Sequence, residues 1–569
     1  MKPCTHITIE PLESRIAPAV LVVTNNSDAL PGSLRAELLL AESMPGFNTI
    51  IFHITPPPSF HSENIITLTS GALQSTGNVN IAGPGAGKLI INGGGSSGVF
   101  NITGTTGLTA ISGLSVVNGS TSGYGAGIYC EESLTLNHVV ISGNSSTAGA
   151  GGGVDVNSSG VAKVTIVNSL ITANSAVLYA GGLDLVDLKS ITIANTVITG
   201  NTVTGSTALG NRGGGIFANT VAGGDGIFIT GCQISGNSAY YGGGLNLNDP
   251  STAPGTGITI TKTVISGNTS TNPGPNGGGG LYIGSGNAVI THSVIAGNTA
   301  AYDGGGIQAS SISSLTISAS TISGNQTTMG SGKGPGGGGV LIRGESSTPL
   351  VSATVLNSVI VDNHSANNGG GIYALDGVSL TISGTYISGN TASGVGGGMS
   401  SYGVSTHKVN LAVTRSLFAN NFASGGSGGI NAGGAGTVYI TNSIVSGNLT
   451  SGNGGGLGIY SSTTATLNDV VVANNLATGT GGGLQFMNTP SFSVTGGAFV
   501  GNGAGSGGGI YADSSSGSIM HAIISGNAAT TAGGGIVDTG DSVTVEGTLV
   551  TGNTAPSGPD FSGTGFNYI

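Results

Sequence analysis

The sequence predicts an all-β fold: a right-handed parallel β-helix, a single-stranded solenoid of about 16 coils with three short strands per coil. The first observation is a phrase, apolar-x-x-Asn followed by a Gly/Ser/Thr stretch and Gly-Gly-Gly-apolar, which occurs fifteen times between Ile141 and Asn553. The second is its period of about 29 residues, which is typical of solenoids whose repeats bury their apolar faces against neighbouring repeats. The third is a period-two alternation of apolar residues with Ser, Thr or Asn, as in half-buried strands.

The first hundred residues differ from the repeats. We expect residues 1–20 to be a targeting-like or disordered segment, 21–100 an N-terminal cap with the first coils, 101–555 the β-helix repeats and 556–569 a C-terminal tail. Ser33–Ala41 is the one convincing amphipathic helix, with Ser33 as its N-cap. A helix across the first coil would cover strand edges that a solenoid end otherwise exposes.

Each repeat predicts three strands separated by turns. In one coil they are Ile372–Leu375, Ser379–Ile382 and Thr385–Ile387. A leucine-rich horseshoe has a similar period, but this chain lacks its leucine framework and its helical half. Coils stacked in parallel about 4.8 Å apart would form a rod on the order of 75 Å long.

The repeat glycines and asparagines have structural roles that require no ligand. Gly-Gly-Gly permits positive φ and close backbone approach at a sharp corner. Asparagine at the other corner tolerates left-handed geometry, can bond its own backbone, and in register would form an amide ladder along the rod. A sugar-binding track is the alternative, but the asparagine occurs whatever loop is nearby. The asparagines are Asn144, Asn174, Asn201, Asn237, Asn268, Asn298, Asn325, Asn363, Asn390, Asn421, Asn448, Asn475, Asn502, Asn527 and Asn553.

Composition limits the class of partner. The net charge is −11 and only 6% of residues are charged, which argues against a nucleic-acid partner. No apolar run is long enough for a transmembrane helix. Cys130 and Cys232 lie about four coils apart, near 20 Å, beyond disulfide reach.

Segments before the repeats carry a family resemblance. Val22–Thr24, Pro31–Arg35 and Phe47–Phe52 resemble the capping segment that carries the Cys-Ser-Leu-Arg-Glu-Ala motif in bacterial β-helix surface proteins. Ile81–Ala86 and Ile111–Leu114 continue that family's pattern.

The body resembles the repeats of the polymorphic outer membrane protein family, whose hallmarks are Gly-Gly-Ala-Ile and Phe-x-x-Asn. Phe418–Asn421 and Phe499–Asn502 fit the second hallmark, while most copies have Ile or Val for Phe and Gly for Ala. Gly32 stands where the cap motif has Cys, and Ala36-Glu37 inverts its Glu-Ala.

The resemblance implies an exported protein, extracellular, at the cell surface or associated with the outer membrane. Its expected role is adhesion, binding or cell-envelope structure, with an extracellular protein, a glycan or an envelope component as partner. It implies no catalytic residue. Pro11–Ala19 also resembles the Leu-Glu-x-Arg segment that opens many large secreted repeat proteins; an ordinary disordered start is the alternative.

Parallel β-helices also include pectin and polysaccharide lyases, so a pectate-lyase-like enzyme is the alternative function. Its best site is a column in which Asp155 and Asp184 point outward from adjacent coils about 5 Å apart, with Asp187 one turn onward. Two such charges would raise one pKa or recruit a cation. The column continues through Phe217, Asn246 and Tyr282 without a basic residue, so solvated strand aspartates are the simpler interpretation.

Other candidate sites are weaker, and we predict no catalytic, cofactor or metal site. His138, His292 and His521 lie on different coils without metal-ligand spacing. An outward threonine column, interrupted by Phe228 and Tyr439, could order water at an ice surface, but threonine is also a favoured strand residue. The column is Thr135, Thr165, Thr192, Thr259, Thr316 and Thr381.

Longer intervals mark positions where variation is tolerated. The extra residues fall in Thr202–Arg212, Thr269–Asn276, Gln326–Pro335 and Gly344–Pro349, and we expect them at one corner of the rod, on a binding edge. Arg212, Lys262, Lys333 and Arg343 lie nearby. Neutral loop drift is the alternative.

The tail after Asn553 contains no helix pattern but is apolar, with Phe561, Phe566, Tyr568 and Ile569. If the chain ends here, we expect the tail to fold over the final coil, or a second molecule to pair with the strands exposed there.

Overall fold

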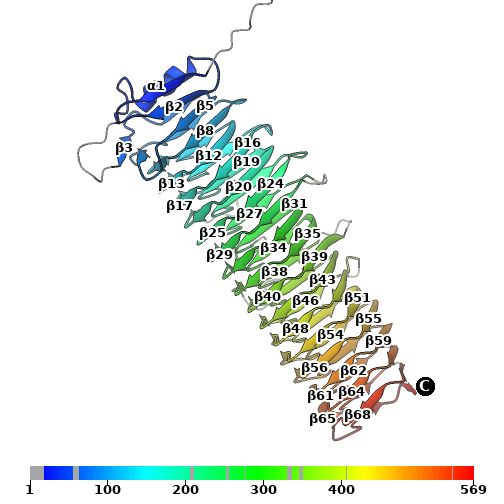
Figure 1. Ribbon diagram of the computed structural model, residues 1–569. Helices are drawn as coiled ribbons and strands as arrows, with labels where there is room; N and C mark the ends of the chain where they lie inside the picture. The colour runs from blue at the N-terminus through cyan, green and yellow to red at the C-terminus, as the bar shows by residue number, and fades with distance from the viewer. Residues whose placement is uncertain are drawn as a thin grey trace, which may run out of the picture.

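The chain folds into one stacked β-helix of about 19 turns. The computed structural model describes residues 18–54, 63–205, 210–251, 256–275, 277–329, 336–344, 350–404, 406–540 and 542–568. Helix α1 (Leu34–Glu42) lies at one end and the last coils lie at the other (Figure 1). The right-handed parallel β-helix predicted from the sequence is confirmed, and the rod is on the order of 90 Å long. The number of coils exceeds the expected 16 because the strands between Val20 and Val117 form coils without the asparagine phrase.

A representative coil contains three main strands and one short strand. They are β42 (Ile372–Leu375), β43 (Val378–Ser383), β44 (Tyr386–Ser388) and β45 (Thr391–Ala392). Equivalent strands of successive coils pair in parallel, and we name the resulting sheets C, A, B and D in that order. Within the described residues, sheets C and A together contain 37 strands and sheet D contains 15. Sheets C and A are joined because β31 (Leu281–Thr291) runs from sheet C into sheet A without a break.

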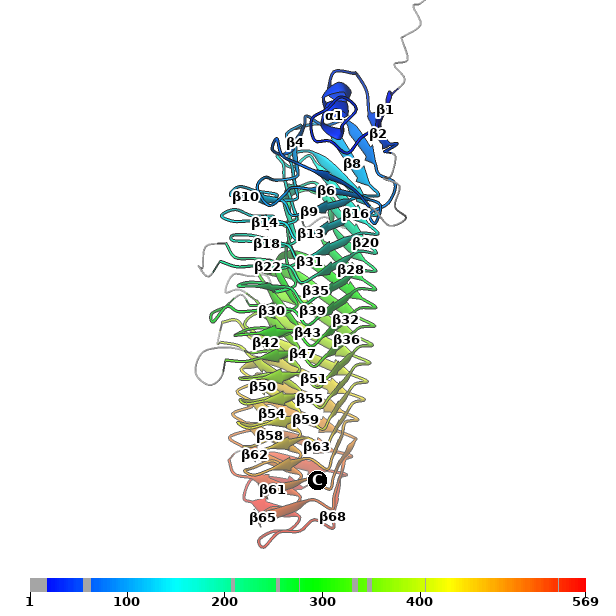
Figure 2. The same cartoon turned by 90° about the vertical axis from the view of Figure 1, so that its left-hand side faces the viewer.

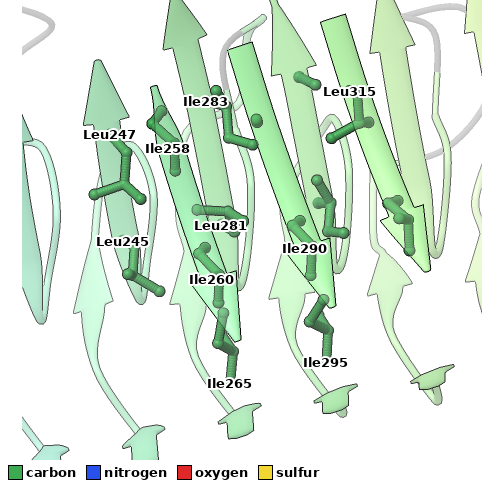
Figure 3. Close-up of a cluster of buried hydrophobic side chains, with 14 of the residues drawn as sticks. Leu245, Leu247, Ile258, Ile260, Ile265, Leu281, Ile283, Ile290, Ile295 and Leu315 are labelled. Carbon is green, nitrogen blue, oxygen red and sulfur yellow. The ribbon is translucent and has the colours of Figure 1, made fainter. Parts of the chain in front are cut away.

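Apolar side chains of sheets A, B and C fill the interior of the rod. Leu245 and Leu247 of β27 (Leu245–Asn248) lie beside Ile258 and Ile260 of β28 (Ile258–Thr261), and the next coil repeats this layer (Figure 3). All four side chains are buried. The alternating pattern predicted which residues face inward because successive strand side chains point to opposite sides.

The predicted asparagine ladder is present at the corner between sheets B and D. The Asn390 amide nitrogen donates to the Asn421 Oδ1 at 3.0 Å and to the Ile360 carbonyl at 2.9 Å. Its Oδ1 accepts from the backbone and side-chain nitrogens of Asn363. The left-handed residue is the one before the asparagine, Gly389 at φ +67°, so the expected left-handed asparagine is wrong for the ladder. The ladder bonds join coils because the amides are buried and stacked.

The Gly-Gly-Gly corner between sheets D and C approaches the neighbouring backbone closely. A Cβ on Gly304, at φ +55°, would lie 2.5 Å from the Ile307 carbonyl oxygen and 2.7 Å from the Gln308 Cβ. The corner therefore folds back over the outward residue of the strand that follows it.

Helix α1 begins after Ser33, as predicted, and the Ser33 Oγ accepts from the Ala36 amide at 3.3 Å. It packs against β1 (Val20–Val23), β2 (Asn48–Phe52) and β4 (Leu73–Ser75) through buried Leu34, Leu38 and Ala41. The helix thus lies on the first strands of the rod (Figure 1).

The residues after Asn553 add a partial coil. Strands β69 (Phe561–Gly563) and β70 (Phe566–Tyr568) pair in parallel with β66 (Ile536–Asp538) and β67 (Val543–Glu546). Phe561 and Phe566 pack against the core with ring centroids 5.3 Å apart. The tail therefore continues sheets C and A instead of lying across them; Ile569 is outside the described residues.

Candidate functional site

The outward column predicted on sheet C has the expected register. Strands β15 (Val154–Asn157), β19 (Leu183–Leu188), β23 (Ile216–Thr220), β27 and β31 place their second residues side by side. These residues are Asp155, Asp184, Phe217, Asn246 and Tyr282.

The two aspartates are nevertheless buried, so their expected solvated position is wrong. Asp155 and Asp184 are each 2% exposed. The corner before each strand folds over them: a Cβ on Gly151 would lie 2.5 Å from the Asp155 Cβ. Ala180 occupies the equivalent corner position before Asp184, with φ +41°. The corner backbone therefore forms an outer layer over sheet C.

Burial changes the protonation of this aspartate pair. It raises the pKa of Asp155 from 3.8 to about 7, although a hydrogen bond from Asp184 lowers it. Burial and the neighbouring Asp155 charge raise the pKa of Asp184 well above its ordinary value. Both shifts have the direction expected for two buried neighbouring carboxyl groups, because burial and like charge favour the protonated form.

The buried pair has no access to a polymer substrate. Asp187 lies further along β19, where it is exposed, and its Oδ1 accepts from the Asn219 amide nitrogen at 3.2 Å. It therefore belongs to a surface contact with Asn219. A substrate would have to displace the corner backbone to contact Asp155 or Asp184.

The described ends of the insertions adjoin sheet C strands in the sequence. The first three insertions begin in sheet D strands at Thr202, Thr269 and Gln326 and precede strands of sheet C, and Gly344 follows the sheet C strand β38 (Val340–Arg343). Residues 206–209, 276, 330–335 and 345–349 of these insertions lie outside the described residues.

A small pocket opens beside the first two of these insertions. Its volume is about 110 Å³, and it is lined by Arg212, Tyr241, Asn246, Asn248 and Tyr282. Asn246 and Asn248 come from β27 and are joined by a 3.0 Å hydrogen bond from the Asn248 amide nitrogen to the Asn246 Oδ1. The pocket thus gathers a guanidinium, two phenols and two amides from three neighbouring coils.

Backbone pairing and aromatic contacts hold the pocket wall. Arg212 forms parallel β-bridges with Tyr179 on one side and Tyr241 on the other. The Tyr179 ring stacks on Phe217 with centroids 5.4 Å apart, and Tyr240 meets Tyr241 edge to face at 4.8 Å. Arg212 is exposed and takes part in none of the three ion pairs of the described residues. Its guanidinium is available to an anionic group.

Among the described residues, Arg343 and Lys262 lie away from Arg212. Arg343 lies 3.4 Å from the buried Asp303 carboxylate, and burial raises the Asp303 pKa to about 7 despite this ion pair. Lys262 lies at the corner between sheets A and B with φ +51°. Lys333 lies outside the described residues. Of the four basic residues expected near the insertions, Arg212 and Arg343 lie beside sheet C strands, and Lys262 lies at a different corner.

The remaining candidates lie where the sequence placed them. His138, His292 and His521 occupy separate coils at the corner between sheets A and B. Within the described ranges, no three His, Cys, Asp or Glu residues are grouped to hold a metal ion. The threonine column lies in register on the outward face of sheet A. Sequence reasoning named Arg212, Asn246 and Tyr282 separately but did not predict that they line one pocket with Tyr241 and Asn248.

One comparison with known proteins, a family model, supports the fold. A family model described as a right handed beta helix region matches residues 214–410. None of the curated proteins matches the chain. Among solved structures, the PL6 family alginate lyase AlyGC aligns over 97% of this chain and 100% of that chain, with 11% identity and a TM-score of 0.19. At this TM-score the likeness carries no argument about fold or activity.

In the part of the chain that the structure describes, no helix has both the length and the apolar character needed to cross a membrane. The family match covers Asp303 and the pocket residues from Tyr241 to Tyr282, but it begins after Asp155, Asp184 and Arg212. The match therefore shows that this part of the chain is similar to right-handed β-helix proteins.

Proposed function

We propose that this chain is an extracellular or cell-surface binding protein whose rigid rod presents the loop-bordered sheet C edge to a partner. The observation that carries the proposal is the exposed Arg212 guanidinium, which lies among tyrosines and asparagines in a pocket. Aromatic and arginine side chains are the residues most often important at binding surfaces. The partner is an extracellular protein, glycan or envelope component that carries a carboxylate or another anion.

Several features favour binding over polysaccharide cleavage. Cleavage requires acid and base groups that reach the substrate, and the paired aspartates are covered by backbone. Arg212 and the pocket amides can bind a ligand, because recognition does not require the paired acid and base that cleavage requires. Repeated backbone pairing makes the rod stiff, so ligand contacts lie on a preorganised surface.

The binding test compares Arg212→Ala with Arg415→Ala, an exposed arginine at the corner between sheets A and B. Binding of purified protein to host envelope fractions and an array of neutral and acidic glycans would be measured. We expect Arg212→Ala to weaken binding about tenfold or more, as for a lost charged contact, and Arg415→Ala to leave it unchanged. Equal binding by the wild type and both variants would show that this edge is not the binding site.

Two further measurements test the class and the location. Purified protein should release no unsaturated oligosaccharide from pectin or alginate, with or without calcium. Steady release that Asp184→Asn abolishes would favour the lyase alternative. Fractionation of the native host should place the protein in the medium, at the surface or with the outer membrane, and recovery from the cytoplasm would contradict export.

A further inference from the structure

A continuous apolar stripe runs along the outward face of sheet B, away from the loop-bordered sheet C. From β29 (Val264–Ser266) to β68 (Leu549–Thr551), the first residue of every strand is in register with that of the next coil. Eight large apolar side chains in this stripe are 37–56% exposed: Val264, Val294, Val359, Tyr386, Ile444, Val471, Ile523 and Leu549. Thr321, Leu417 and Ala498 complete it.

The stripe lies beside a shoulder of mostly small residues. The third residue of the same strands is usually Ser, Ala or Thr, as at Ser266, Ala296 and Ser446. Neither outward column contains Asp, Glu, Lys or Arg between Val264 and Thr551. Because the shoulder side chains are short, the larger stripe side chains form a ridge that contains no charged residue. The rod that carries the stripe is straight in both views (Figures 1 and 2).

The stripe is about as large as the largest apolar patch on a typical soluble monomer, and such patches are often functional. Eleven coils at about 4.8 Å give a length of about 50 Å, and three strand residues give a width of about 10 Å. Pairing two such faces would bury on the order of 1,000 Å² in total, the lower limit for a specific interface. Contiguous apolar patches of several hundred Å² mark interaction sites.

The regular spacing identifies the partner. A surface that meets this ridge side chain for side chain over ten intervals must repeat at the same inter-strand distance. A second copy of this chain has that repeat and the same uncharged face, and two β-sheet faces pack about 10 Å apart through interdigitated side chains. We propose that two copies of this chain pair through their sheet B stripes to form a two-fold symmetric dimer of parallel or antiparallel rods. Such an isologous contact closes and leaves both sheet C edges free for a partner.

The test measures mass in solution. Wild-type protein would be followed by sedimentation equilibrium up to about 100 µM, a range suited to an interface of this small area. We expect the mass to rise from 54.8 kDa toward about 110 kDa with concentration. Val359→Lys/Ile444→Lys/Ile523→Lys should hold the protein at the monomer mass, because three ammonium groups would face an apolar partner.

The matched control adds the same charge to the same three coils on another face. Thr354→Lys/Tyr439→Lys/Ser518→Lys places the lysines on the outward column of sheet A and should dimerise as the wild type does. A second stripe variant with threonine at 359, 444 and 523, the residue already present at Thr321, covers the case in which the lysine variant fails to fold; it should weaken dimerisation about tenfold or more.

Three outcomes would overturn the proposal: a wild type that stays monomeric, a control that loses dimerisation, or a threonine variant that dimerises normally. A monomer that floats with neutral phosphatidylcholine vesicles would assign the stripe to lipid instead. Dimerisation through sheet B does not involve Arg212. Failure of the dimerisation proposal therefore leaves the Arg212 binding proposal standing, and the reverse also holds.

Discussion

At the residue scale, the buried asparagines are the most specific bonds between coils. In Asn390→Ala the Ile360 carbonyl and the Asn363 backbone nitrogen would lose their partners inside the rod. Each unsatisfied buried group costs about 1–3 kcal/mol, so we expect a loss of about 3 kcal/mol or more. Denaturant unfolding followed by circular dichroism measures this loss.

Asn468→Ala is the matched control for the ladder. Asn468 lies on the outward face of β55 (Thr464–Asn468) and is partly exposed. Its replacement should change the free energy of unfolding by about 0.5 kcal/mol or less. Similar losses from both substitutions would mean that the ladder amides contribute little.

The aspartate pair shows both the reach and the limit of sequence reasoning. Alternation along β15 and β19 predicts that Asp155 and Asp184 leave the core and share a column, and the structure confirms both points. Their burial could not be predicted, because period two identifies a side of the sheet but not the backbone that covers it. The ladder asparagine was recognised because it recurs, whereas Arg212 and its pocket occur once.

This buried pair predicts a stability that falls as pH rises. The folded pKa of Asp155 is about 7, above its ordinary value of 3.8, and that of Asp184 is raised as well. Between these values the folded state holds protons that the unfolded state releases, so the stabilisation is complete below about pH 4 and is lost as pH rises through about 7. Buried Asp303 contributes with the same sign.

Thermal melts at pH 5.5 and pH 8.5 would measure this dependence; these values bracket the Asp155 pKa. We expect the wild type to melt several degrees lower at the higher pH. Asp155→Asn/Asp184→Asn should show a smaller difference, since neutral amides release no proton. An identical pH dependence in both proteins would show that the pair does not titrate in this range.

At the element scale, the corner before each sheet C strand is the feature that most depends on backbone conformation. Ala180 has φ +41° where Gly304 and other coils have glycine. Left-handed backbone costs a non-glycine residue about 1 kcal/mol, so Ala180→Gly should stabilise the protein by up to about that amount. An increase in the melting temperature would confirm it.

Gly304→Ala is the reciprocal change and should be more harmful. Its Cβ would meet the Ile307 carbonyl oxygen and the Gln308 Cβ at 2.5 and 2.7 Å, in addition to the strain of φ +55°. We expect a loss of about 2 kcal/mol or more by thermal unfolding. A neutral effect would mean that the corner moves away easily.

A second ladder at the corner between sheets A and B was not predicted. The Thr263 amide donates to the Ser293 Oγ at 3.2 Å, and the Ser293 amide donates to the Ser320 Oγ at 3.1 Å. Cys232 occupies the equivalent position one coil earlier, where its amide donates to the Thr263 Oγ1. Serine and threonine are so common in this chain that their recurrence at this corner does not stand out in the sequence. The asparagine phrase does stand out.

At the scale of the whole molecule, the repeat period of the sequence predicts a solenoid. The period is recognised from many copies of the phrase, so it stays visible where a single copy departs from the pattern. The tail could not be assigned in the same way. It lacks the Asn and Gly-Gly-Gly phrase, yet β69 and β70 continue two sheets because parallel backbone pairing does not require that phrase.

The quasi-one-dimensional rod predicts that damage at the last described coil stays local. The Asn553 amide nitrogen donates to the Asp560 Oδ1 at 2.8 Å, so Asp560 supplies the acceptor that a further ladder asparagine would provide. Asp560→Ala removes one hydrogen bond of about 1 kcal/mol, whereas Asp560→Asn keeps an acceptor. Each coil contacts its neighbours only, so hydrogen exchange should accelerate severalfold from Leu549 to Tyr568 in the alanine variant and remain unchanged around Asn390. Faster exchange along the entire rod would show that coils unfold as one unit, and faster exchange in the asparagine variant would show that the carboxylate itself, not its acceptor oxygen, holds the last coil.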